Sequence, residues 1–354
     1  MRHLALTVDY ELFGNGTGDV VQHVTGPTER MAALCRQHSV PLTVFFEAEE
    51  YLAFERHAEE LKRSWGHDPA RLIREQLAAL AGQGHDIQLH LHPQWVGARF
   101  ENGGWVLRPD QETVDGLFAS QEEVTAYIGE RKAVIERLVA PSAPGRTVRA
   151  YRAGAFAAQP GRKLLSALAH HGIVIDSSVV NGLQRKDDHV CLDYRKVPAG
   201  RQLWRVREDV AVEDRTGPLW EVPIHSVPRR RFQQATFSRL KAKFSKNVPR
   251  EQQRRMVQQL GVGRGLLPML RFLLQRVPIK LDFHNLSPRT LLRWIKAAPA
   301  DPSAPLDVLV LIGHTKEHLN DRAFGEFLAW VKREPGLEVV SLDRLADLLA
   351  TART

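Results

Sequence analysis

Short apolar runs that read as β-strands alternate with helix-compatible stretches along most of this 354-residue chain. The strand-like runs are LALTVDYE (4–11), PLTVFFEA (41–48), HDIQLHLH (85–92), VRAYRAGAF (148–156), GIVIDSSV (172–179), LWEVPIHS (219–226), PIKLDFHN (278–285) and LDVLVLIGH (306–314). Helices are predicted between some of them, over Thr28–His38, Ala70–Gln83, Gln121–Leu138 and Pro160–His171. Such alternation is typical of a parallel sheet with helices outside it, and about eight strands favour a (β/α) barrel over a doubly wound sheet.

Three segments interrupt the alternation, and we predict that they are insertions in a single barrel domain spanning residues 1–354. Residues 96–107, with Asn102-Gly103-Gly104 at their centre, read as a β-hairpin. Residues 183–220 are rich in charged and β-branched side chains and are predicted to be irregular. Residues 228–277 are predicted to form a basic helical insertion.

The composition argues against several classes of protein. Hydrophobic residues make up 43% of the chain and charged residues 25%, as in ordinary globular proteins. The two cysteines, Cys35 and Cys191, are far apart and have no CxxC spacing, so neither a disulfide framework nor a thiolate zinc site is expected. We find no signal-peptide pattern and no apolar run of about 18 residues, so we expect a cytoplasmic protein.

The segment HDIQLHLHPQW places two histidines near the end of a strand. Because side chains alternate between the faces of a strand, His90 and His92 share one face, opposite Leu89 and Leu91. Pro93 ends the strand, and active sites of (β/α) barrels form at this C-terminal end. A lone histidine here would more often be a satisfied core residue, but two in phase are typical of metal ligands. The pattern therefore predicts a metal site.

The first strand shows the same periodicity. Asp9 and Glu11 share one face, and Val8 and Tyr10 share the other. Carboxylates at the end of a buried strand are costly unless they are paired, hydrogen-bonded or bound to a metal. A salt-bridged acidic pair at the start of a loop would give the same pattern. Beside the two histidines, however, these acids would supply the oxygen ligand and the general base of a hydrolytic metal site.

Five segments resemble, in this order, the successive motifs of the polysaccharide deacetylase family: TVDYE, GHDIQLHLHP, YRAGAF, IDSS and LIGHTKEH. The chain looks like a divergent member of this family, which is also described as carbohydrate esterase family 4. The resemblance spans nearly the whole chain. It implies a distorted (β/α)7-type barrel, and it implies an enzyme that removes N-acetyl groups from amino sugars.

The resemblance also assigns roles to residues of the first two motifs. It makes Asp9 the general base and His90 the first metal-binding histidine. Typical members have a metal-binding aspartate where this chain has Tyr10, and a second histidine where it has Gln94. Glu11, or Asp9 itself, would replace the missing aspartate, and His92, on the same strand face as His90, would replace the missing histidine. The implied metal ligands are Asp9, Glu11, His90 and His92.

Later motifs supply further candidates. Arg152 in YRAGAF matches the arginine that orients the catalytic aspartate and keeps it ionised, since an opposite charge nearby lowers a carboxylate pKa. His314 in LIGHTKEH matches the general acid histidine, which protonates the departing amine. The residues predicted to contact the substrate are Trp95, Asp176, Asp282 and His284.

The predicted cofactor is a divalent metal, with Zn²⁺ as the first choice, because imidazole and carboxylate ligands suit it; Co²⁺, Ni²⁺ and Fe²⁺ fit the same donors. The predicted reaction is metal-dependent hydrolysis of an N-acetyl group on an amino sugar, during biosynthesis of a surface polysaccharide or glycolipid. Two other functions fit the sequence. One is a deacylase of a small amide, and the other is a catalytically inactive barrel that binds carbohydrate, which Tyr10 and Gln94 would suit.

Residues 228–280 contain fourteen Lys and Arg residues and a single acid, Glu251, so the net charge of +8 is a property of this segment. A solvated helical face is the commonest role of such a run. The arginines would also suit an acetylated amino sugar linked to a nucleotide or lipid diphosphate. They would equally suit an anionic membrane surface, which would place the protein at the inner face of the membrane. No nucleic-acid-binding motif accompanies these charges, so no nucleic acid partner is expected.

Overall fold

The computed structural model describes residues 1–198, 200–230, 232 and 273–352. Its main sheet has nine strands in the order β10-β11-β7-β6-β3-β2-β1-β14, and β15 also pairs with β1. All pairings in this sheet are parallel except that of β10 with β11. The strands are β1 (Arg2–Tyr10), β2 (Thr43–Glu47), β3 (Asp86–Leu91), β6 (Ala150–Ala153), β7 (Ile175–Asp176), β10 (Trp204–Val206), β11 (Leu219–Glu221), β14 (Asp307–His314) and β15 (Leu337–Val340).

The chain that follows β11 connects the β7 region with β14, which lie far apart in the strand order. Ile224 bridges in parallel both to Val180, just beyond β7, and to Val310 of β14. Asp282 makes a further parallel bridge to Ile312 of β14. Short bridges take the place of full strands on this side, so the sheet closes into a distorted barrel. The predicted fold class is confirmed.

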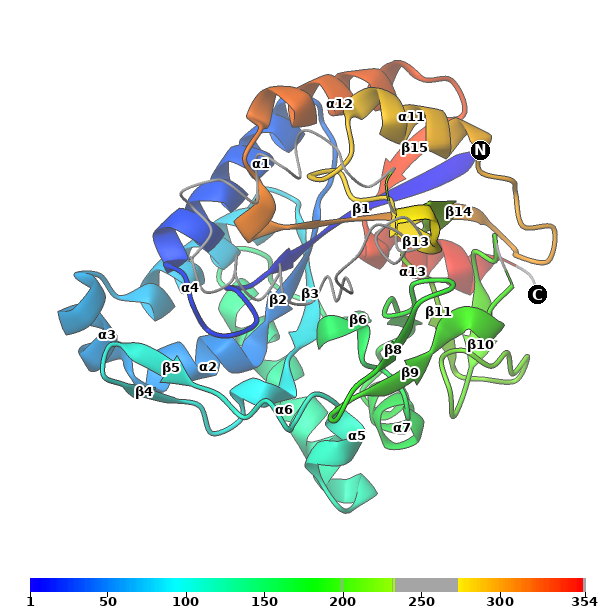
Figure 1. Cartoon of the computed structure of the whole chain (residues 1–354). Coiled ribbons are helices and arrows are strands. Elements are labelled where there is room, and N and C mark those ends of the chain that lie inside the picture. The colour runs from blue at the N-terminus through cyan, green and yellow to red at the C-terminus, as the bar shows by residue number, and fades with distance from the viewer. Residues whose placement is uncertain (199, 231, 233–272, 353–354) are drawn as a thin grey trace.

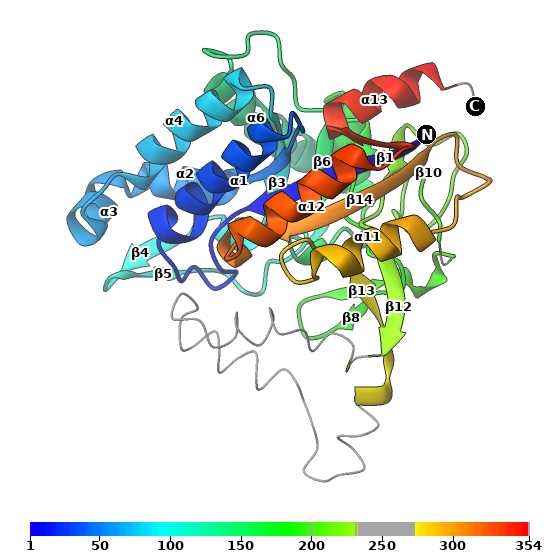
Figure 2. The same cartoon turned by 90° about the horizontal axis from the view of Figure 1, so that it is seen from above.

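Helices surround the strands (Figures 1 and 2). Several begin at polar caps that satisfy free backbone N–H groups: Ser120 and Glu123 form a capping box at α6, and Asp68 before Pro69 caps α4. No helix within the described residues is long and apolar enough to cross a bilayer. The helices are α1 (Gly26–Gln37), α2 (Ala48–Arg56), α3 (Ala58–Trp65), α4 (Pro69–Gly82), α5 (Val114–Leu117), α6 (Gln121–Val139), α7 (Arg162–His170), α11 (Pro288–Ala297), α12 (Asp321–Arg333) and α13 (Leu342–Thr351).

Three antiparallel strand pairs lie outside the main sheet: β4 (Arg99–Glu101) with β5 (Gly104–Val106), β8 (Gln184–Lys186) with β9 (Cys191–Asp193), and β12 (Ser226–Arg230) with β13 (Arg276–Lys280). The first turns at Asn102 and Gly103, both with positive φ. The β8–β9 pair, β10 and the start of β11 belong to segment 183–220. Of the basic segment 228–277, residues 231 and 233–272 lie outside the described residues, so its predicted helical structure stays a prediction, as does the division into insertions.

Side-chain alternation divides the core into an outer and an inner part. On β1, Leu4, Leu6 and Val8 pack in the outer cluster, whereas Ala5 joins the inner one. Helix α13 contributes several apolar residues to the inner cluster, and its Leu342 N–H donates to Thr43 Oγ1 at the start of β2. This helix therefore packs against the N-terminal ends of the strands. The inner cluster comprises Ala5, Phe45, Ala150, Ile175, Val180, Leu203, Trp220, Val222, Ile224, Val308, Val310, Ile312, Val340, Leu342, Leu345, Ala346 and Leu349.

At the C-terminal ends of the same strands, the inward positions are polar. Asp9 lies in register with His314 on β14, and His90 lies in register with Arg152 on β6. The apolar interior below fixes which face of each strand points inward. The strand register therefore gathers four of the predicted site residues at one end of the barrel.

Candidate metal centre and active site

Three polar side chains meet where β1 and β3 end. Glu11 follows β1, while His90 lies on β3 and His92 follows it. Glu11 Oε2 lies 2.7 Å from His92 Nε2 and 3.5 Å from His90 Nε2. The ligand atoms of all three lie within 4.8 Å of one another. One carboxylate oxygen and two imidazole nitrogens make a donor set that suits Zn²⁺.

The surroundings of His90 fit a metal ligand. Its Nδ1 donates to the carbonyl oxygen of Arg152 at 2.9 Å, since a carbonyl can only accept, so Nε2 is the ring nitrogen available to a metal. That Nε2 is buried and has no hydrogen-bond partner among the described residues. A backbone carbonyl on the other ring nitrogen is the usual support of a metal-binding histidine. A bound cation would satisfy the otherwise unpartnered nitrogen.

Lys316 holds the other oxygen of Glu11. Its Nζ lies 2.8 Å from Glu11 Oε1 and donates to the carbonyl oxygen of Leu12 at 2.7 Å. Burial by itself would raise the pKa of Glu11, but Lys316 and then His92 lower that pKa well below its usual value. Glu11 is therefore an ionised carboxylate whose Oε2 stays turned toward the two histidines.

The predicted general base, Asp9, is paired with a buried arginine. Arg152 Nη1 donates to Asp9 Oδ1 at 2.6 Å, and both residues are buried. The other oxygen, Oδ2, lies 3.4 Å from His314 Nε2. Burial would raise the pKa of Asp9, but the nearby positive groups, Arg152 first, lower the pKa below its usual value. Asp9 is therefore ionised at neutral pH, as a general base must be.

His314 lies between two carboxylates. Its Nδ1 is 3.5 Å from Glu317 Oε2, while its Nε2 faces Asp9. Burial would lower the pKa of His314, but Glu317 and then Asp9 raise that pKa above its usual value. Asp282 belongs to the same group, since its ligand atom and those of His314 and Glu317 lie within 4.8 Å of one another. His314 is held toward its protonated form, as a general acid must be.

Sequence reasoning missed three residues of this region: Glu47, Glu50 and Lys316. Glu47 Oε1 accepts a hydrogen bond from the backbone N–H of His92 at 2.8 Å. Both carboxylate oxygens of Glu50 accept from the N–H of Leu12, at 3.1 and 3.0 Å. Burial raises the pKa of Glu50 to about 8. The sequence contains one indication of Glu47 and Glu50. The run FFEAEE, like LALTVDYE, is the end of an apolar strand followed by acidic residues.

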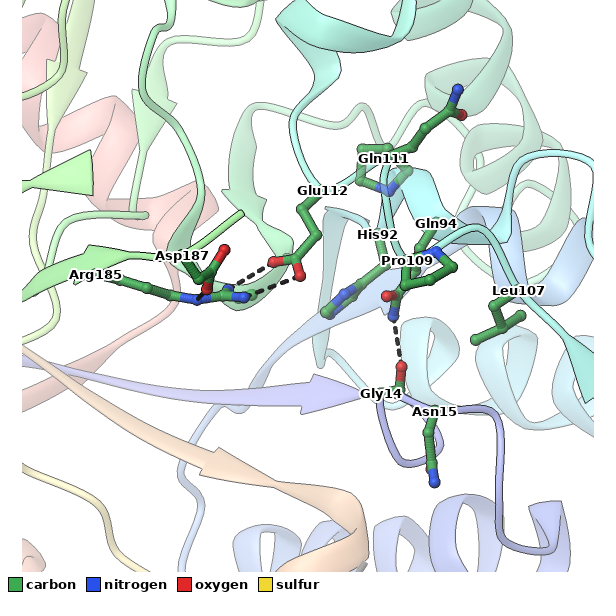
Figure 3. Close-up of a pocket in the computed structure, with 13 residues that line it drawn as sticks. Gly14, Asn15, His92, Gln94, Leu107, Pro109, Gln111, Glu112, Arg185 and Asp187 are labelled. Carbon is green, nitrogen blue, oxygen red and sulfur yellow. Dashed lines mark hydrogen bonds and ion pairs between the residues drawn. The ribbon is translucent and has the colours of Figure 1, made fainter. Parts of the chain in front are cut away.

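A pocket of about 550 Å³ opens beside His92. In Figure 3, Arg185 and Glu112 meet on one side of His92, and Gln94 and Gly14 meet on the other. Arg185 Nη1 and Nη2 contact the two Glu112 oxygens at 2.6 and 2.9 Å. Seven of the thirteen lining residues within the described structure have polar side chains. The lining residues are Gly14, Asn15, His92, Pro93, Gln94, Leu107, Pro109, Gln111, Glu112, Gly154, Ala155, Arg185 and Asp187.

Two of the predicted substrate contacts are buried away from this pocket. Trp95 is 1% exposed, and its ring packs edge-on against Phe54 at 6.0 Å and Trp105 at 5.1 Å. Asp176 is fully buried and accepts hydrogen bonds from the N–H and hydroxyl of Ser178 at 3.0 and 3.1 Å. Neither residue lines the pocket. No contact within the described structure therefore supports their substrate role, which stays a prediction.

The other two predicted substrate contacts lie beside the candidate general acid. Asp282 Oδ1 accepts from the N–H of His284 at 2.9 Å, and His284 Nδ1 accepts from the N–H of His314 at 3.1 Å. Burial, followed by the charge of His318, lowers the pKa of His284 well below its usual value. His284 is therefore a neutral ring that supports His314, and contact with substrate stays a prediction for both residues.

Tyr10 and Gln94 are the two residues that stand where the motifs of the polysaccharide deacetylases have metal ligands. Tyr10 is buried on the outer face of β1, and its hydroxyl donates to Gln76 Oε1 at 2.9 Å. Its side chain points away from the metal centre. Gln94 lines the pocket, and its Nε2 donates to the carbonyl oxygen of Gly14 at 2.7 Å. The candidate metal centre is thus built without side chains from either position.

Neither a family model nor a curated protein matches the sequence. Three solved structures illustrate what the fold is similar to. They are a probable polysaccharide deacetylase from Pseudomonas aeruginosa PAO1 (11% identity, 98% of this chain and 89% of that chain, TM-score 0.43), a family 4 carbohydrate esterase from Streptomyces lividans (9% identity, 96% and 91%, TM-score 0.37) and a 4-alpha-glucanotransferase from Thermococcus litoralis (10% identity, 98% and 40%, TM-score 0.49). A probable polysaccharide deacetylase and a family 4 carbohydrate esterase are thus among the structures that the fold is similar to. Any assignment of activity rests on the residues of this chain.

Proposed function

We propose that this protein is a metal-dependent amide hydrolase that removes the N-acetyl group of an amino sugar. One observation carries the proposal: an ionised carboxylate, Asp9, and an imidazole whose pKa is raised, His314, face each other beside a donor set that suits a divalent metal. A general base, a general acid and a set of metal ligands are the components of metal-dependent amide hydrolysis. The same end of the barrel also opens into a polar pocket.

Each component has a defined task in this proposal. Arg152 fixes one oxygen of Asp9, which leaves the other to take a proton from the attacking water. His314, held by Glu317, donates a proton to the departing amine. Glu11, His90 and His92 would hold the metal, which when bound supplies a Lewis acid for the amide carbonyl.

We further propose that the group bound in the pocket is an uncharged sugar. Arg185 is the one cation among the described lining residues, and Glu112 and Asp187 already pair with it, the latter at 2.7 Å. Hydroxyl groups suit the amide and carboxylate side chains around it. A diphosphate-linked substrate would place its anionic group beyond this lining. A role in biosynthesis of surface polysaccharide or glycolipid is part of the same proposal.

The direct test is acetate release from a panel of acetylated amino sugars. Purified protein reconstituted with Zn²⁺ should release acetate from N-acetylglucosamine oligomers, and chelation should stop the reaction. Asp9→Asn should lower kcat by about 10²–10⁴-fold while zinc binding is kept. Full zinc occupancy without acetate from any sugar would contradict the proposal. It would favour a small amide substrate or an inactive barrel that binds carbohydrate.

A further inference from the structure

Helix α2 begins with a cluster of buried acids directly behind the candidate metal centre. Glu47 is the last residue of β2, and Glu49 and Glu50 lie in the first turn of α2. Their exposed fractions are 1%, 1% and 3%. Glu49 pairs with Arg131, whereas no salt bridge within the described structure joins Glu47 or Glu50 to an Arg or Lys. Two buried acids one turn apart, without a paired Arg or Lys, lose their hydration, so hydrogen bonds within the protein must replace it.

Glu47 connects the helix start to His92. Its Oε1 accepts from the backbone N–H of His92 at 2.8 Å. Its Oε2 accepts from the N–H of Glu50 and so caps α2. A helix cap alone needs one short polar side chain, such as serine or aspartate. The longer side chain of Glu47 is what reaches the backbone of His92, just after β3.

Glu50 makes the matching connection to β1. Its two oxygens accept from the N–H of Leu12, the residue after Glu11, at 3.1 and 3.0 Å. The carbonyl oxygen of Leu12 accepts from Lys316, which also holds Glu11 Oε1. One helix start therefore holds the backbone of both segments whose side chains, Glu11 and His92, meet at 2.7 Å.

We propose that Glu47 and Glu50 are positioning residues of the candidate metal centre. By holding the backbone of His92 and of Leu12, they keep the side chains of Glu11 and His92 close enough to bind one metal ion. The inference rests on the proposed function, because it assigns these acids to the metal centre of that enzyme. Support of this kind around a metal ligand is typically worth about 10–100-fold in metal affinity.

The test separates positioning from helix capping. Glu47→Ser keeps a good cap for α2 but is too short to reach His92, whereas Glu47→Gln keeps an oxygen that can accept from His92. Glu49→Ser is the matched control, since Glu49 is equally buried on the same turn but pairs with Arg131. The dissociation constant for Zn²⁺ is measured by competition with a chromophoric chelator, and stability by urea unfolding. Glu50→Ala provides a second positioning variant.

We expect Zn²⁺ affinity to fall about 10-fold or more in Glu47→Ser and Glu50→Ala, and to stay within about 3-fold of wild type in Glu47→Gln and Glu49→Ser. Equal losses in Glu47→Ser and Glu49→Ser would overturn the inference, because the effect would then follow stability alone. Unchanged affinity in Glu47→Ser would also overturn it and leave the proposed function standing. A wild-type protein without zinc affinity would overturn both. If Glu47→Ser does not fold, the comparison of Glu50→Ala with Glu49→Ser decides.

Discussion

Replacing Arg152 with methionine removes the guanidinium that neutralises the buried carboxylate of Asp9. Arg152 is fully buried and also donates to Thr7 Oγ1 at 2.9 Å and to the carbonyl oxygen of Ser177 at 3.0 Å. Breaking a buried pair by removing one partner costs about 3–5 kcal/mol. We therefore expect Arg152→Met to lower the free energy of unfolding by that amount at neutral pH. Urea unfolding followed by tryptophan fluorescence measures it.

A double-mutant cycle isolates the ion pair from the other contacts of Arg152. In an Asp9→Asn background the Asp9 carboxylate is no longer there to lose its partner, so Arg152→Met should cost less there by about 2 kcal/mol or more. Arg71→Met is the control, because the exposed pair of Arg71 and Glu75 is worth about 0.5 kcal/mol or less. The reasoning fails if Arg152→Met costs the same in both backgrounds.

Three further predictions concern single residues. Gly154→Ala places a Cβ about 2.5 Å from His92 Cγ, so the ring must shift, and Zn²⁺ affinity in a chelator competition should fall about 10-fold or more. Tyr10→Phe removes the hydrogen bond to Gln76 and should cost about 1 kcal/mol in urea unfolding with Zn²⁺ affinity unchanged; a loss of affinity would show that Tyr10 takes part in the metal centre. Burial lowers the pKa of His225 to about 4 in the folded protein, below an unfolded value of about 6.5. The unfolded chain therefore binds more protons, so stability should fall as pH drops from about 6.5 to 4, and His225→Phe should flatten the stability profile measured by urea unfolding across this range.

Local periodicity accounts for the parts of the site that were predictable. The two-residue repeat puts Asp9 on the inward face of β1, with Glu11 in phase just beyond the strand, and puts His90 on the inward face of β3. The apolar interior then fixes which face points inward. The helix-compatible stretches are likewise local, and α6 occupies Gln121–Val139 where Gln121–Leu138 was predicted. Patterns of this kind depend on residues close together in the sequence, so they can be read without knowing the strand order.

Contacts between distant segments could not be read in this way. Glu47 reaches the backbone of His92, 45 residues away, and that contact depends on β2 and β3 being neighbours in the sheet. Lys316 reaches Glu11 only because β14 pairs with β1. The predicted strand 219–226 contains Ile224, but the bridges of Ile224 to Val180 and Val310, which close the barrel, join residues far apart in the sequence. Such features are set by the packing of the whole fold.

The central claim is that Glu11, His90 and His92 hold one catalytic metal ion. Diffraction from zinc-soaked crystals, with data collected on either side of the zinc absorption edge, tests it most directly. We predict one anomalous peak within bonding distance, about 2.0–2.2 Å, of Glu11 Oε2 and of the Nε2 atoms of both histidines. A peak bound instead by Asp282, His314 and Glu317, or the lack of any peak at saturating zinc, would contradict the account.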